Sequence, residues 1–234
     1  MRTSGIHRYA ACGINGSHGG ESVELFRRRA RAFCPEPVSL DNAYLYKGRA
    51  DLHRIYSMEP TTRLLKVPFE SQLDNASGQG YRECFSSSAA MLAKYWGRIS
   101  SDDAYNKVRR RFGDTTSAQA QVAALRALGL RSHLWTNGRQ IDLMNEIAGG
   151  RPVGVGWLHR GSPMAPTGGG HWSVVIGYDA AGVFMNDPNG EADLVRGGYL
   201  ANRNGAGLHY SWRNWSPRWQ VEGPGSGWYL TCSP

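Results

Sequence analysis

The hydrophobic pattern of the chain changes near residue 150, from the period of helices to that of strands. Before this point, four segments place apolar residues on one face of a helix: 84–96, 100–113, 117–130 and 142–150. After it, the apolar runs are short and strand-like: 152–159, 171–179 and 183–188. A chain with its helices first and its strands afterwards favours an α+β fold, in which a helical half packs on an antiparallel sheet.

Turn signals divide these segments further. Ala180-Ala181-Gly182 joins the strands 171–179 and 183–188, which predicts a hairpin. The segment 160–170 is rich in glycine and proline and is expected to be a long flexible loop, and 190–234 is expected to hold short strands. A boundary near residue 62 separates an N-terminal extension of unclear fold, residues 1–62, from the main domain, residues 63–234.

Composition excludes several classes of function. The 234 residues carry a formal charge of +8, and the excess is spread along the chain without a nucleic-acid-binding motif. No run approaches the roughly 20 apolar residues of a membrane span, and the start lacks the apolar stretch of a secretory signal, so cytoplasmic synthesis is expected. The four cysteines form no CxxC pair, which argues against a zinc site, and neither a metal nor a cofactor is expected. One disulfide, for instance between Cys12 and Cys34, stays open.

Three groups with complementary chemistry follow one another along the chain. Cys84 lies where a glycine-rich loop turns into a helix, and the positive end of a helix lowers the pKa of a thiol. His171 opens a strand directly after a glycine cluster, and Asp187 ends the next strand. In a hairpin, Asp187 would fix the tautomer of His171 and stabilise its charged form. Each residue alone is more often structural, but the three together predict a nucleophilic thiol site.

Acyl transfer also needs donors for the developing oxyanion. The backbone N–H of Cys84 offers one, and Gln72, at the end of a strand-like run, is the preferred second, with Gln79 as its rival. Gly169 and Gly170 permit close approach of a substrate before His171. Trp172 is a candidate wall of the substrate site, although a role in the core is the stronger alternative.

Three stretches carry a family resemblance: "VPFESQLDN", "ECFSSSAAMLAKYWG" and "GGGHWSVVIGYDAAGVFMNDPNG". Together they resemble the papain-like cysteine peptidases related to the bacteriocin-processing, double-glycine leader peptidases, and most of all a branch found in phage and bacterial proteins. The resemblance covers about residues 64–190 and implies a papain-like fold for residues 63–234. It implies Cys84 as nucleophile, His171 as general base and acid, Asp187 as the orienting carboxylate and Gln72 as the oxyanion donor. The chain has Cys84-Phe85-Ser86 where leader peptidases usually have Cys-Gly-Pro or Cys-Gly.

The expected activity is therefore that of a cysteine peptidase. A free-standing, basic, phage-like member suggests an endolysin or other cell-wall lysin that cuts the peptide part of bacterial peptidoglycan after release, as a monomer, with the positive charge holding it on an anionic wall. Two alternatives stay open. One is a soluble peptidase that trims leader peptides after a double glycine, and the other is a catalytically inactive papain-like binding module.

Overall fold

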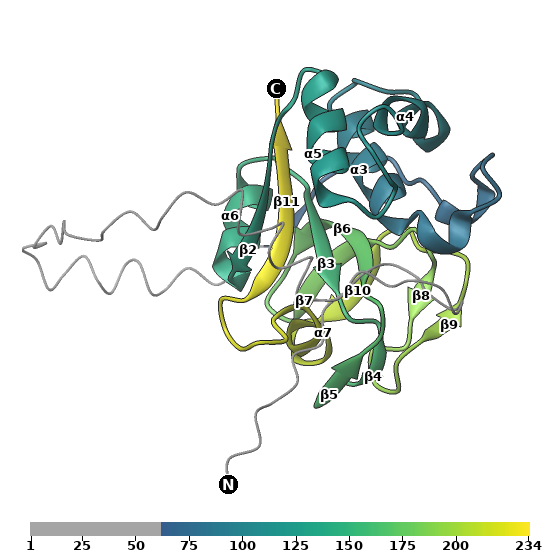
Figure 1. Cartoon of the computed structure of the whole chain (residues 1–234). Coiled ribbons are helices and arrows are strands. Elements are labelled where there is room, and N and C mark those ends of the chain that lie inside the picture. Colours follow the sequence, from purple (N-terminus) through teal and green to yellow (C-terminus); the bar gives the residue numbers. More distant parts are fainter. Residues whose placement is uncertain (1–61) are drawn as a thin grey trace, which may run out of the picture.

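The computed structural model describes residues 62–234, and the expected extension 1–62 lies almost entirely outside them (Figure 1). Within the described residues, a seven-stranded antiparallel sheet runs through the molecule. Six strands follow the order β10-β7-β6-β3-β11-β2, and the seventh, β1, pairs with the C-terminal end of β6. Its strands are β1 (Arg63–Leu64), β2 (Arg131–Gly138), β3 (Val153–Trp157), β6 (His171–Tyr178), β7 (Gly182–Asn186), β10 (Leu208–Ser211) and β11 (Gly227–Ser233).

Three helices cover one face of this sheet (Figure 1). They are α3 (Cys84–Tyr95), α4 (Asp102–Arg109) and α5 (Ala118–Ala127). The side chains of Ser101 and Ser117 accept hydrogen bonds from the first turns of α4 and α5, as expected of N-caps. Small residues make α3 buried almost all round, so it lies deep between the sheet and the other two helices. Its apolar side chains pack on Trp172, Val174 and Ile176, which alternate along β6.

The opposite face is covered by α6 (Gln140–Ala148) and α7 (Trp212–Trp219). Leu143 and Ile147 of α6 pack there with Val175 of β6, and the stacked rings of Trp215 and Trp219 are buried under α7. These two tryptophans therefore belong to the core. Because α3–α5 and α6–α7 lie on different faces, β6 is covered by apolar side chains on both sides, and all eight of its residues are buried.

Two small hairpins lie outside the main sheet (Figure 1). They are β4 (Arg160–Ser162) with β5 (Ala165–Thr167), and β8 (Glu191–Ala192) with β9 (Tyr199–Ala201). The flexible loop expected over 160–170 is therefore wrong for most of its length, because Arg160 pairs with Thr167 across a tight turn. The remaining short elements, η1 (Gln72–Asp74) and η2 (Gly80–Arg82), are single 3₁₀ turns ahead of α3.

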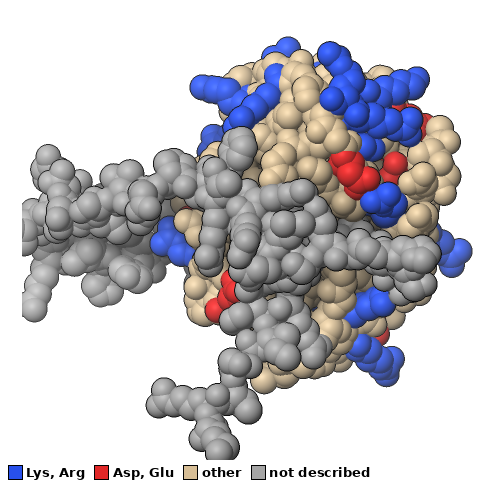
Figure 2. Space-filling model, viewed as in Figure 1, with Lys and Arg blue, Asp and Glu red and all other residues tan. Residues whose placement is uncertain are grey.

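The predicted fold class is confirmed: a helical half packs on an antiparallel sheet in an α+β arrangement. Within residues 62–234, none of the helices combines the length and the apolar character that crossing a bilayer requires. Figure 2 shows Lys and Arg side chains in several separate groups on the face in view, so the basic charge forms no single stripe there.

Candidate active site

Cys84 is the first residue of α3 and is fully buried. No side chain caps this helix at Glu83, so the amides of its first turn and the positive end of its dipole surround the cysteine. Such a position favours a thiolate over a thiol. Cys84 is disulfide-bonded in the structure, and reduction is therefore required before its sulfur can act as a nucleophile.

His171 and Asp187 form a buried pair on neighbouring strands. His171 begins β6, Asp187 directly follows β7, and the Nε2 atom of His171 lies 2.6 Å from Oδ1 of Asp187. The side chain of His171 is 4% exposed and that of Asp187 is 0% exposed. Because Nε2 faces the carboxylate, Nδ1 is the ring nitrogen left for proton transfer.

The carboxylate of Asp187 has two further donors. The backbone N–H of Asn189 lies 3.0 Å from Oδ1, and the hydroxyl of Tyr210 lies 3.3 Å from Oδ2. Burial and the nearby Asp187 charge raise the pKa of Tyr210 well above its usual value, so this hydroxyl remains a donor. Three donors therefore hold the Asp187 carboxylate in place beneath the imidazole of His171.

Three aromatic rings surround the imidazole of His171. The rings of Trp157, His159 and Tyr199 all lie edge-on to it, with centroids 5.5 to 5.8 Å away. Burial, followed by the field of His171 and of neighbouring arginines, lowers the pKa of His159 to about 3. His159 is therefore neutral at ordinary pH and adds no positive charge beside His171.

The start of α3 and the start of β6 are in direct contact. Phe85 follows Cys84, Trp172 follows His171, and the rings of these two residues stack with centroids 3.6 Å apart and planes 3° from parallel. The contact brings the chain at Cys84 and the chain at His171 to one junction between the helical half and the sheet. Trp172 is 6% exposed and belongs to the core cluster, which matches the core alternative for this residue.

Gln72 lies at the same junction. Its side-chain Nε2 donates to the carbonyl of Gly80 at 2.7 Å, and its backbone N–H donates to the carbonyl of Pro188, next to Asp187, at 2.9 Å. Gly80 has no room for a side chain, since a Cβ there would lie 2.1 Å from the Gln72 carbonyl oxygen. Gln72 is 3% exposed, whereas Gln79 is an exposed residue. Of the two glutamines, Gln72 is the one tied to the loops on either side of the site.

A bend at Gly168 and Gly169 leads through Gly170 into His171. Gly170 has φ +81°, a conformation that disfavours side chains. The expected role of Gly169 and Gly170 in substrate binding stays a prediction, as do the expected roles of Cys84, His171, Asp187 and Gln72.

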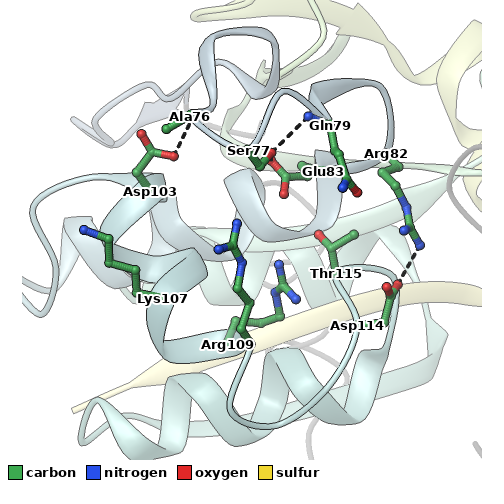
Figure 3. Close-up of a pocket in the computed structure, with 11 residues that line it drawn as sticks. Ala76, Ser77, Gln79, Arg82, Glu83, Asp103, Lys107, Arg109, Asp114 and Thr115 are labelled. Carbon is green, nitrogen blue, oxygen red and sulfur yellow. Dashed lines mark hydrogen bonds and ion pairs between the residues drawn. The ribbon is translucent and has the colours of Figure 1, made fainter.

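A polar pocket of about 580 Å³ opens on the helical half (Figure 3). Its acidic side chains already have donors: Glu83 accepts from Asn75 and Ser77, and Asp114 pairs with Arg82. The polar stretch around Asn75 and Ser77 thus holds the Glu83 carboxylate. The pocket contains none of the three groups Cys84, His171 and Asp187.

Sequence reasoning missed several residues around His171. Trp157 and Tyr199 contact it from β3 and β9, and Tyr210 of β10 donates to its partner Asp187. No local sequence signal tells which aromatic residues turn toward the site. His159, which precedes the β4–β5 hairpin, also contacts the imidazole.

The sequence was compared with models of known protein families. Residues 64–213 match the model of the Peptidase_C39 like family, which is more than half of the chain. The chain belongs to the Peptidase_C39 like family. No curated protein matches the sequence significantly.

Three solved structures are similar to this chain. A putative C39-like peptidase from Bacillus anthracis is 16% identical, with a TM-score of 0.55 over 74% of this chain and 98% of its own. The peptidase domain of Streptococcus ComA is 18% identical, with a TM-score of 0.45 over 71% and 97%. A double glycine motif protease from an AMS/PCAT transporter, solved with its leader peptide, is 18% identical, with a TM-score of 0.45 over 74% and 96%. At these identities the likeness to the Bacillus anthracis protein concerns the fold, and it agrees with the predicted papain-like fold.

Proposed function

We propose that this member of the Peptidase_C39 like family is a cysteine peptidase. Its active site, where peptide bonds of a substrate are hydrolysed, lies at the junction of α3 and β6. The observation that carries the proposal is the buried His171–Asp187 pair. The strand β6, which His171 begins, contacts the first turn of α3 through the Phe85–Trp172 stack. A thiolate, a base with a fixed tautomer and an orienting carboxylate are the groups that thiol acyl transfer requires.

In this proposal, the Cys84 thiolate attacks the carbonyl carbon of the scissile bond, and the carbonyl oxygen becomes an oxyanion. The backbone N–H of Cys84 and the side-chain amide of Gln72 stabilise that charge. The intermediate collapses as His171 gives its Nδ1 proton to the departing amine, which leaves a thioester on Cys84. Water then attacks the thioester while His171 takes one of its protons, and the carboxylic acid product leaves the regenerated thiolate.

The substrate we propose is a polypeptide with small residues at the scissile bond. Cys84, His171 and Gln72 are all buried, so the carbonyl must approach through a narrow space, and glycine offers the least steric hindrance. This choice follows the leader-peptidase alternative that the sequence left open. The expected action on peptidoglycan gains no support from the family or the fold.

The test measures cleavage of a fluorogenic peptide that has Gly-Gly before the scissile bond, in the presence of a reductant. Zymography on peptidoglycan is run in parallel to detect cell-wall hydrolysis. We expect cleavage of the peptide after Gly-Gly and its loss, by at least about 10²-fold, in Cys84→Ala and His171→Ala. Cys232→Ser is the matched control, because Cys232 is a buried cysteine on β11 whose pKa is raised to about 12 by its burial. Full activity of Cys84→Ala, or clearing of peptidoglycan without peptide cleavage, would overturn the proposal. Peptide binding without cleavage would favour the inactive binding module.

A further inference from the structure

Arg218 is a fully buried arginine on α7 that takes no part in the proposed chemistry. Its guanidinium donates five hydrogen bonds, all of them to backbone carbonyls. Nη1 reaches Leu158 at 3.2 Å and Arg160 at 3.1 Å, Nη2 reaches Gly161 at 2.6 Å and Leu194 at 2.8 Å, and Nε reaches Leu194 at 3.1 Å. Within the described part of the chain, no carboxylate forms an ion pair with it. Asp193 acts on the guanidinium through its field, while every hydrogen bond of the guanidinium goes to a carbonyl. A buried charge is costly unless its donors are satisfied, so this arrangement fixes the carbonyls closely.

These carbonyls belong to two separate segments. Leu158, Arg160 and Gly161 lie where β3 turns into the β4–β5 hairpin, and Leu194 lies in the turn of the β8–β9 hairpin. The backbone of Gly197 also meets that of Gly161 so closely that no Cβ fits between them. Arg218 and the four carbonyls, called here the Arg218 clamp, therefore join the two hairpins to α7.

The clamped segments carry two of the rings that touch His171. His159 stands between Leu158 and Arg160, and its carbonyl accepts the N–H of Gly198 at 2.7 Å. Tyr199, the next residue, begins β9. The rings of His159 and Tyr199 lie 5.7 Å apart, and each packs against the imidazole of His171. The position of both rings thus depends on backbone that Arg218 holds.

We propose that Arg218 is a positioning residue of the active site, whose clamp holds His159 and Tyr199 against His171 so that the imidazole stays on Asp187 and away from water. The activity part of this inference rests on the proposed peptidase function. A shift of about 1 Å in a catalytic group is enough to lower a rate by about a hundredfold, so loosening the clamp acts on kcat more than on binding.

The test is Arg218→Lys, which keeps the charge but replaces a planar fork with one ammonium that cannot reach carbonyls on both hairpins. Arg126→Lys is the matched control, because two nitrogens of Arg126 also donate to a backbone carbonyl, that of Ser132 in β2. Arg126 belongs to α5, which lies on the face of the sheet opposite α7. We expect Arg218→Lys to lower kcat by tenfold to a hundredfold, with KM changed by less than about threefold. Arg126→Lys should change neither constant.

Proton NMR gives a second readout that needs no activity. The His171 Nε2 proton, bonded to Asp187, should give a downfield signal in the wild-type protein that Arg218→Lys broadens or removes and Arg126→Lys retains. If the wild-type protein cleaves no peptide, the proposed function fails while this signal still tests the clamp. If Arg218→Lys does not fold, Tyr199→Leu replaces it, because this change removes one of the two rings that the Arg218 clamp holds against His171. It should likewise lower kcat and broaden or remove the downfield signal. A folded Arg218→Lys with wild-type kcat and an unchanged signal would show that the clamp only stabilises the fold.

Discussion

At the scale of single residues, the site depends most on how Asp187 holds His171. Asp187 is fully buried and accepts from the imidazole, the Asn189 N–H and the Tyr210 hydroxyl. An asparagine at this position retains an oxygen for the imidazole but loses the negative charge that stabilises the imidazolium. An alanine loses both and leaves the three donors without this acceptor.

We therefore predict a graded loss of activity. Asp187→Asn should lower kcat by roughly tenfold. Asp187→Ala should lower it by about 10²-fold or more, because the proton transfer by His171, which contributes about 10²- to 10⁴-fold, then loses its orientation. Steady-state kinetics under reducing conditions measures both, and circular dichroism checks that each variant is folded. Equal activity of the wild type and Asp187→Ala would show that the carboxylate does not orient the base.

At the scale of secondary structure elements, the junction of α3 and β6 joins the two halves of the site. The Phe85–Trp172 stack is its best-defined contact, and an aromatic pair contributes about 1 kcal/mol beyond the area it buries. Residue 85 is also where this chain departs from the Cys-Gly pattern usual in leader peptidases. The departure has a structural explanation, because the phenylalanine fills the space against Trp172.

Phe85→Leu should lower kcat about tenfold as well as the free energy of unfolding, because the start of α3 loses its fixed position against β6. Tyr95→Phe is the matched control at the other end of the same helix, where the Tyr95 hydroxyl donates to Gly150 at 2.8 Å. We expect that control to lose about 1 kcal/mol of stability with no change in kcat. If both variants lose stability equally and both keep full activity, the stack has no role in placing the nucleophile.

The sequence allowed some elements to be predicted and not others, for physical reasons. The helices α3, α4 and α5 and the β6–β7 hairpin have local signals: serine caps, a helical period and a short turn. The helix α7 contains Pro217, which suggests a break, and the β4–β5 hairpin is masked by its glycine and proline content. Cys84, His171, Asp187 and Gln72 could be predicted as site residues because their chemistry and order are visible along the chain. Tyr199 and Arg218 could not be singled out, since the roles proposed for them rest on contacts between distant segments.

At the scale of the whole molecule, two buried groups of the described residues respond to acid with opposite effects on stability. Burial raises the pKa of Asp102 to about 6 from its usual 3.8, so the folded state binds its proton more tightly, and Asp102 adds stability as the pH falls from 6 to 4. Burial lowers the pKa of His159 from 6.5 to about 3, so the unfolded state binds its proton first, and His159 removes stability as the pH falls from 6.5 to 3.

Between pH 7 and pH 5 the expected changes are a loss of about 2 kcal/mol from His159 and a gain of about 1 kcal/mol from Asp102. Together they leave a net loss of about 1 kcal/mol in the wild-type protein. Asp102→Asn should therefore lose about 2 kcal/mol over this interval, more than the wild type, and His159→Gln should gain about 1 kcal/mol. Urea unfolding at pH 7, 6 and 5 measures the three slopes, and differences between pH values remove any constant cost of each substitution. Parallel slopes for all three proteins would mean that neither group is held in its neutral form by burial in the native state.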